Sequence, residues 1–310
     1  MSTTGIAVFA YDRPSHLKNV LEGLKQNEVN HLYIFSDGPE TEEDTENVEA
    51  VRKVIEQVNW CSKTVVTRES NLGLAQSIVQ GIDRVFRDHD RIIVLEDDCV
   101  PAANYVSFMR KCFDRYEQDS QVMNISGYSP PIDIPEEYPY DGFFTYRASS
   151  WGWGTWKSSW EVFEHEPFTL DYLNNHRADL KETMLISGHD MFPMMEDQLR
   201  GDIDSWAIWW GYAIATNQGV SLCPVHSKIR NIGHEGRGTH SNKNDKFEVC
   251  LDDTAISSMN LPDEPFVNED IHRRHIEFAG GGKWYPLKHR TAKILRRIGL
   301  WGVYRSLIGS

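Results

Sequence analysis

Short apolar runs alternate with amphipathic segments along the first 126 residues. Five apolar runs predict strands at residues 6–10, 31–35, 64–67, 91–95 and 122–126. The segments between them carry apolar residues at helical spacing. They predict helices that begin near residue 15, cover residues 41–57 and 73–86, and run from beyond Pro101 to about Tyr116. Strands and helices that alternate in this way are typical of an α/β protein with a mainly parallel sheet.

The pattern changes after residue 127. Residues 128–140 are rich in Pro, Tyr and acidic residues, which is typical of a loop, and tryptophan then becomes dense within 151–160 and 206–210. No repeat or flexible linker separates the two halves. We therefore expect residues 1–127 to form one α/β half, residues 128–282 to pack against it as a smaller sub-domain, and residues 283–310 to form a separate tail.

Charge is unevenly distributed along the 310 residues. The formal net charge of −14 excludes a protein that coats nucleic acid, because neutralising phosphates needs a basic face. Residues 283–310 nevertheless contain seven Lys or Arg residues and no acid, interleaved with apolar residues. This tail predicts an amphipathic helix on an anionic membrane surface. The alternative is a helix that docks on the acidic body or on another subunit.

The cysteines and the apolar runs indicate a cytoplasmic protein. Five scattered cysteines show no C-x-x-C spacing, which argues against a disulfide framework and against a structural zinc site. No window has the length of a membrane-spanning helix, and the N-terminus has no basic region before its apolar run, so we expect no signal peptide.

Three consecutive acidic residues follow the most apolar predicted strand. Glu96, Asp97 and Asp98 end this strand, and ligands of open α/β sheets bind at the carboxyl ends of strands. Side chains alternate along a strand, so one carboxylate can hold a hard divalent cation while its neighbours contact hydroxyl groups. Mg²⁺ or Mn²⁺ with a diphosphate would relieve their repulsion. The alternative is a solvated acidic turn.

Several ordered motifs resemble one enzyme superfamily over residues 5–245. They are FAYDRP at 9–14, SDG at 36–38, NLGL at 71–74, LEDD at 95–98, SSWGWGTW at 149–156, DSWAIWW at 204–210 and NIGHEGRGTH at 231–240. The sequence resembles nucleotide-sugar-dependent glycosyltransferases of GT-A fold, of the bacterial family 2 type. It is more distantly similar to the N-acetylglucosaminyltransferase I type, which also carries Glu-Asp-Asp at this point. The resemblance implies a Rossmann-like nucleotide-binding sheet flanked by helices and fused to a smaller acceptor-side sub-domain.

The resemblance also implies roles on the donor side. Asp98 is expected to bind the metal, Mn²⁺ or Mg²⁺, and Glu96 and Asp97 are expected to order the sugar and the ribose. The remaining donor-binding residues are expected near the nucleotide: Ala10 at the end of the first strand, Arg13 at the diphosphate, Asp37 at the nucleoside, and Asn71 at the base. An ordinary surface arginine and an ordinary Asp-Gly turn are the alternatives for Arg13 and Asp37.

Glycosyl transfer with inversion needs a general base for the acceptor hydroxyl. The resemblance assigns this role to Asp204, which precedes a Trp-rich helical segment; Asp202 is the substitute, and a helix N-cap is the structural alternative. Trp153 is the candidate for a flat substrate wall, although most tryptophan clusters form core. His240 and His234, in the glycine-rich segment, are candidates for a donor contact and a metal contact respectively, with a plain surface loop as the alternative.

Together these features predict a hexosyl- or N-acetylhexosaminyltransferase. The expected donor is a nucleoside diphosphate sugar, with UDP as its nucleotide, and the expected acceptor is a glycan or lipid-linked saccharide of a cell-surface polysaccharide. A nucleotidyltransferase is one alternative, but FAYDRPS has neither the Gly nor the Lys of a triphosphate-binding loop. A non-catalytic carbohydrate-binding protein is the other.

Overall fold

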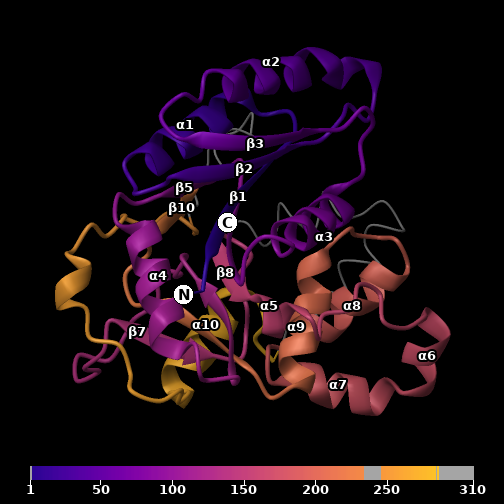
Figure 1. Cartoon of the computed structure of the whole chain (residues 1–310). Helices are drawn as coiled ribbons and strands as arrows, with labels where there is room; N and C mark the ends of the chain where they lie inside the picture. The colour runs from indigo at the N-terminus through magenta and orange to yellow at the C-terminus, as the bar shows by residue number, and fades with distance from the viewer. Residues whose placement is uncertain (1, 234–245, 284, 286–310) are drawn as a thin grey trace, which may run out of the picture.

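The computed structural model describes residues 2–233, 246–283 and 285. Its centre is an eight-stranded sheet with the order β3-β2-β1-β4-β8-β6-β9-β7 (Figure 1). The strands are β1 (Thr4–Ala10), β2 (His31–Ser36), β3 (Ser62–Thr67), β4 (Arg91–Glu96), β6 (Val122–Ser126), β7 (Gly142–Thr145), β8 (Trp153–Trp156) and β9 (Val220–Pro224). The five strands expected from the apolar runs are all present, within two residues at either end.

The first four strands in the sheet order run parallel, and the rest of the sheet is mixed. β8 lies antiparallel between β4 and β6, β9 is parallel to β6, and β7 is antiparallel to β9. The chain passes from β1 to β2 on one side and from β3 to β4 on the other, so connections diverge between β1 and β4. The carboxyl ends of these two strands therefore border a crevice of the kind in which open α/β sheets bind ligands.

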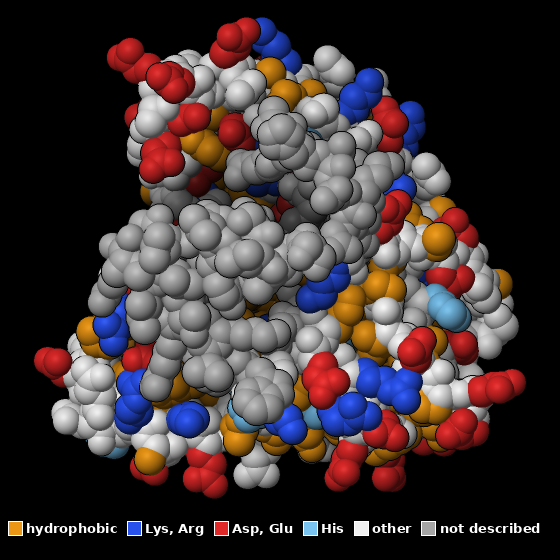
Figure 2. Space-filling model, turned by 180° about the vertical axis from the view of Figure 1, so that it is seen from behind, with side chains coloured by type: hydrophobic (Ala, Val, Ile, Leu, Met, Phe, Trp, Pro, Cys, Tyr) orange, Lys and Arg blue, Asp and Glu red, His pale blue; other side chains and the backbone are white. Residues whose placement is uncertain are grey.

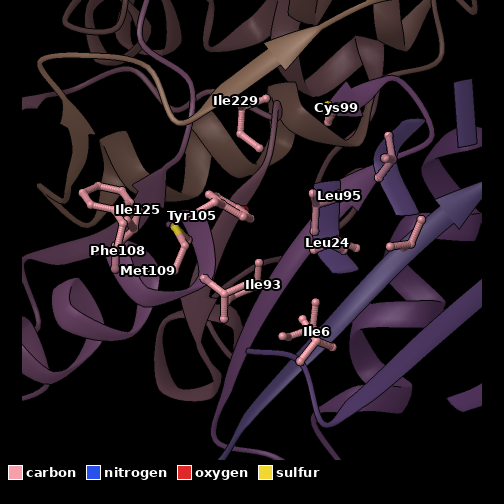
Figure 3. Packing of buried hydrophobic residues seen from close by; sticks show 14 of the residues in the cluster. Ile6, Leu24, Ile93, Leu95, Cys99, Tyr105, Phe108, Met109, Ile125 and Ile229 are labelled. Carbon is pink, nitrogen blue, oxygen red and sulfur yellow. The ribbon is translucent and has the colours of Figure 1, made fainter. Parts of the chain in front are cut away.

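Helices cover both faces of the sheet. Buried side chains of α1 (Pro14–Lys25), α2 (Thr45–Glu56) and α4 (Tyr105–Tyr116) pack on one face, and those of α3 (Leu74–Val85) and α9 (Trp206–Thr216) on the other. Figure 3 shows the first of these cores, where Leu24 of α1 and Met109 of α4 lie against Ile93 and Leu95 of β4. The helix expected at 41–57 is instead a 3₁₀ turn, η1 (Glu42–Asp44), followed by α2.

The second half of the chain completes the same sheet and adds a small helical group. α7 and α8 pack beside α9, with a core of Leu, Met, Phe and Trp side chains (Figure 1). The remaining elements are α5 (Lys157–Trp160), α6 (Leu170–Asn175), α7 (Arg177–Leu185), α8 (Met191–Leu199), η2 (Ile256–Ser258), α10 (Glu269–Phe278) and a two-stranded sheet of β5 (Cys99–Pro101) and β10 (Ile229–Asn231). α9 thus lies between α3 and the α7–α8 pair, and joins the two halves.

The surface reflects the acidic composition. Acidic side chains gather at the upper end of the molecule, over η1 and α2 (Figure 2). Among the residues described, no helix combines the length and apolarity needed to cross a bilayer. The predicted membrane-binding tail falls outside the described residues, except for Lys283 and Tyr285.

Candidate active site

A cleft of about 390 Å³ opens where β1, β2 and β4 end. Eight residues expected in the donor site from the sequence line it: Ala10, Arg13, Asp37, Asn71, Glu96, Asp97, Asp98 and Asp204. Six of the eight lie on, or within three residues of, the carboxyl end of a parallel strand. The topology of the sheet therefore brings them together, because parallel strands end at one edge.

Arg13 faces the acidic triplet across the cleft. Its Nη1 atom lies 3.1 Å from Asp98 Oδ2 and 3.8 Å from Asp97 Oδ1. The backbone N–H of Tyr11 donates to Asp97 Oδ2 at 3.2 Å, so the loop after β1 is tied to the loop after β4. Among the residues that the structure describes, Arg13 is the one whose positive charge lies against both of these carboxylates. About a third of its side chain is exposed.

Burial disfavours the ionised forms of two acids of the triplet. Burial, helped by the charges of Asp98 and Asp97, raises the pKa of Glu96 to about 8. Burial also raises the pKa of Asp97 to about 6, against the opposing effects of Arg13 and the Tyr11 amide. A further cation at this site would therefore stabilise the ionised forms of Glu96 and Asp97.

The carboxylate donors fit a hard divalent ion but do not enclose one. Within the described ranges, no three His, Cys, Asp or Glu side chains are grouped to hold a metal. Carboxylate oxygens are the ligands that Mg²⁺ and Mn²⁺ prefer, and Mg²⁺ in nucleotide sites is commonly held by one or two carboxylates together with substrate phosphates. Asp97 and Asp98 match this arrangement if a diphosphate supplies the other ligands.

Asp37 and Asn71 hold two loops together at the other side of the cleft. The Asp37 carboxylate accepts hydrogen bonds from the backbone N–H of Leu72, at 3.1 and 3.2 Å, and from that of Gly38 at 3.0 Å. The Asn71 amide donates to the Gly38 carbonyl at 3.2 Å and accepts from the Gly73 N–H at 2.7 Å. Both side chains thus shape the loops as well as lining the cleft.

Asp204 reaches the cleft from the second half of the chain. Its Oδ2 atom accepts a hydrogen bond of 3.4 Å from the Ala75 N–H, at the start of α3. Gly73 precedes α3 with a φ of +80°, a conformation that favours glycine, and a Cβ atom there would lie 3.2 Å from Asp204 Oδ2. Asp204 is exposed and lines the cleft, whereas Asp202 is exposed and lies outside its lining.

The chain returns to the triplet just before the histidine-containing segment. The Asn231 side chain donates to Asp98 Oδ1 at 3.1 Å, and the Ile232 N–H donates to the Asp98 carbonyl at 2.9 Å. A Cβ atom on Gly233 would overlap Asp98 Oδ2, so only glycine allows this approach. His234 and His240 themselves lie outside the described residues, and their expected roles stay predictions.

Trp153 does not line the cleft. It is fully buried and stacks on Trp206 of α9, with ring centroids 4.9 Å apart. The expectation of a substrate wall is therefore corrected: as the first residue of β8, Trp153 points into the core between the sheet and α9. Trp151 instead is partly exposed; it lies before β8, and Gly152 between the two tryptophans has a φ of +55°, a conformation that favours glycine.

Six further residues line the cleft that the sequence did not single out. They are Phe9, Tyr11, Glu40, Gly73, Leu74 and Ser77. The Tyr11 hydroxyl accepts a hydrogen bond from the Glu40 N–H at 3.2 Å, which ties the loops after β1 and β2 together. Tyr11 lies within the FAYDRP motif, and Leu74 is an apolar residue with nearly half of its surface exposed, so position at a strand or helix end was the available signal.

Comparison with known proteins identifies the family. The model of glycosyl transferase family 2 matches residues 6–176, more than half of the chain, and the chain belongs to this family. The prediction of a glycosyltransferase-type α/β fold of the GT-A class is thereby confirmed. No curated protein sequence matches the chain.

Solved structures with a similar arrangement are distant in sequence. They include a mannosyltransferase from Pyrobaculum calidifontis in complex with GDP-Man and Mn²⁺ (13% identity, 53% of this chain and 48% of that one, TM-score 0.39). GalNAc-T7 with UDP, GalNAc and Mn²⁺ is 12% identical over 71% of this chain and 42% of that one, with a TM-score of 0.45. TarS of S. aureus is 7% identical over 73% of this chain and 36% of that one, with a TM-score of 0.42. The chain thus spans less than half the length of each of these three.

Proposed function

We propose that this protein is an inverting, metal-dependent glycosyltransferase that uses a nucleoside diphosphate sugar. The observation that carries the proposal is the convergence of Arg13, the acidic triplet, Asp37 and Asp204 on one cleft at the switch point of the sheet. Membership of glycosyl transferase family 2 supports the same reaction class. UDP is the donor nucleotide that we expect, and the transferred group is a hexosyl or N-acetylhexosaminyl residue.

In this proposal each charged or polar residue of the cleft has one role in binding or catalysis. Arg13 is suited to contact the diphosphate, because a guanidinium forms paired hydrogen bonds with phosphate oxygens. Asp37 and Asn71 border the nucleoside end, while Glu96 and Asp97 contact the ribose and the sugar. Asp204 takes the proton from the acceptor hydroxyl as that oxygen attacks the sugar, and the nucleoside diphosphate leaves from the opposite face.

Asp98 would hold Mn²⁺ or Mg²⁺. When bound, the ion would neutralise charge on the departing diphosphate. The fit rests on the carboxylate oxygens at the end of β4 and on the raised pKa values of Glu96 and Asp97, whose ionised forms a cation would stabilise.

The acceptor that we propose is a glycan or a lipid-linked saccharide of a cell-surface polysaccharide. The basic amphipathic pattern of residues 283–310 supports peripheral contact with an anionic membrane on the cytoplasmic side, where a lipid-linked acceptor would be reached.

A thermal-shift titration tests the proposed donor site. UDP, GDP, ADP and their sugars are added with and without Mn²⁺ to the intact chain, to Asp98→Ala and to Asp204→Asn, since a ligand that binds the native state raises its stability. We expect a Mn²⁺-dependent shift for one nucleotide, its loss in Asp98→Ala, and its retention in Asp204→Asn. Turnover of Asp204→Asn, measured as release of nucleoside diphosphate, should fall roughly 10²- to 10⁴-fold.

Two results would contradict the proposal. If no nucleotide raises the melting temperature of the intact chain, the cleft is not a nucleotide-binding site. If turnover is unchanged in Asp204→Asn, Asp204 is not the general base. An exposed acid outside the cleft, Asp171→Asn in α6, is the matched control and should leave both readouts unaltered.

A further inference from the structure

A second pocket adjoins the donor cleft across the start of α9. Its volume is about 340 Å³, and Ser205, Ala207 and Ile208 form part of its wall, whereas Asp204 lines the donor cleft. The segment 204–208 therefore borders both cavities, with Asp204 in the lining of the first and Ser205, Ala207 and Ile208 in that of the second. A molecule in the second pocket would lie next to Asp204.

Four aromatic side chains form one wall of this pocket, which we call the aromatic wall. Tyr128 and Trp151 meet edge to face with ring centroids 4.6 Å apart. Trp151 meets Phe247 at 5.4 Å, and Phe247 meets Phe278 of α10 at 5.6 Å, both again edge to face. Each ring fixes the orientation of the next, because edge-to-face contact is favourable for aromatic pairs.

A lysine reinforces the far end of the wall. The Lys246 ammonium lies 5.2 Å from the centroid of the Phe247 ring and 4.6 Å from that of Phe278. Such contacts between a cation and a ring face are attractive and orient both rings. The wall is thus held at several points along the chain, from residue 128 to residue 278.

The pocket lining also contains flexible apolar side chains and hydroxyl groups. Met191 and Met194 of α8 and Ile208 of α9 are the apolar members. Methionine side chains adapt to ligands of different outline. Ser149, Ser150 and Ser205 supply hydroxyl groups at the lining.

The charged group in the lining is already neutralised. Arg147 makes two hydrogen bonds to the buried Asp190, at 2.7 and 2.8 Å, and a third to the Ser187 carbonyl at 3.1 Å. A paired arginine of this kind offers N–H groups without a free net charge. The lining thus offers hydrogen-bonding groups that suit a molecule with several hydroxyl groups.

We propose that this pocket binds the acceptor, and that a pyranose ring of the acceptor lies against Trp151. The inference rests on the proposed transferase function. A pyranose has an apolar C–H face, which matches an aromatic ring, and a rim of hydroxyls, which matches the serines and Arg147. A hydrocarbon chain would cover these polar groups without pairing them, which is unfavourable. Trp151 thereby takes the role that the sequence suggested for Trp153.

Saturation-transfer NMR tests the pocket directly, with methyl glycosides as probes. Methyl α- and β-glycosides of glucose, galactose, mannose, rhamnose and N-acetylglucosamine are added to the intact protein at millimolar concentration. 1-Hexanol serves as a probe that has a hydrocarbon chain but no sugar ring. We expect at least one glycoside to bind through its C–H face. Trp151→Ala should weaken that binding roughly five- to tenfold, and Trp151→Phe should weaken it less, because a smaller ring remains.

The control is Trp60→Phe, in the loop between α2 and β3 at the far edge of the sheet, which should leave glycoside binding unchanged. The proposal is overturned if no glycoside binds, or if 1-hexanol binds and the glycosides do not. It is also overturned if Trp151→Ala binds glycosides like the intact chain. Nucleotide shifts of Trp151→Ala should equal those of the intact chain. If nucleotides bind normally and no glycoside binds, only the proposal of an acceptor pocket is rejected, and the proposed transferase function stands.

Discussion

The two sides of Asp204 are built in different ways. On the donor side, most of the functional residues directly follow strands β1, β2 and β4, and a parallel sheet brings such positions together by its topology. On the acceptor side, the aromatic wall joins residues from position 128 to position 278, which come from loops and from α10. Most residues of the proposed donor cleft thus follow strands directly in sequence. The residues of the proposed acceptor pocket come together only through contacts between distant parts of the sequence.

This difference leads to an unequal sensitivity to mutation. Substitution of Arg13, which is partly exposed in the cleft, should change ligand binding with little change in stability. Substitution of a buried residue close to the aromatic wall, such as Trp153, should change stability, because Trp153 belongs to the core between the sheet and α9. Three predictions test this contrast, from the largest effect to the smallest.

The largest effect is expected from the two neighbouring tryptophans. Trp153 is fully buried against Trp206, so Trp153→Ala should lower the free energy of unfolding by about 3–5 kcal/mol. Trp151 is partly exposed in the pocket, so Trp151→Ala should lower it by about 1 kcal/mol. Urea denaturation followed by circular dichroism measures both. Equal losses would mean that Trp151 also belongs to the core.

The same pair of residues shows where sequence reasoning ends. Both tryptophans lie in the SSWGWGTW motif, and the pattern alone does not say which one faces a ligand. That choice depends on Gly152, whose positive φ departs from extended strand geometry, and on β8, a four-residue strand inserted between β4 and β6. A strand this short has too few positions for a periodic signal. Its place in the sheet follows from contacts with residues far away in sequence.

The donor side was predictable for the opposite reason. Apolar runs located β1, β2 and β4, and the residues after each run were polar, so the carboxyl edge of the sheet could be inferred before any contact was known. Asp204 is the exception, because it comes from a position 129 residues after Ala75, to whose N–H it bonds. The resemblance to a family supplied that residue; no local pattern did.

The second prediction concerns acid and the acceptor side. His275 of α10 is buried, with its Nδ1 3.4 Å from Thr145 Oγ1 and its ring against Phe143. Burial, with the nearby charges of Arg147 and His272, lowers the pKa of His275 from 6.5 to about 3. The unfolded chain therefore binds a proton between pH 6.5 and pH 3 that the folded chain does not, so stability falls as the pH falls through this window.

Between pH 7 and pH 5, His275 should lower the free energy of unfolding by about 2 kcal/mol. Urea denaturation at several pH values should show this slope in the intact chain and a shallower one in His275→Leu. His272, which bonds the Ile186 carbonyl at 2.9 Å and whose pKa burial also lowers, contributes in the same direction. Arg147, which also faces His275, forms an ion pair with Asp190. An identical slope in His275→Leu would assign the acid sensitivity to other groups.

The smallest effect is expected on the donor side, from Arg13. Its guanidinium lies 3.1 Å from Asp98 and is the described cation that faces the triplet, so Arg13→Met removes a diphosphate partner and a counter-charge together. We expect the affinity for UDP in the presence of Mn²⁺ to fall about tenfold, because a hydrogen bond to a charged group contributes on this scale.

Isothermal titration of Arg13→Met should separate the two roles of this residue. Affinity for Mn²⁺ without nucleotide should rise or stay level, because the carboxylates lose the guanidinium that competes for their oxygens. Arg84→Met, which removes an exposed ion pair with Asp88 on α3, is the matched control and should alter neither binding constant. Unfolding free energy should change by less than about 1 kcal/mol, because Arg13 is partly exposed and its pairing is screened by water. A large loss of stability together with unchanged UDP affinity would reverse the contrast, since Arg13 would then support the loops after β1 and β4 and would not contact the donor.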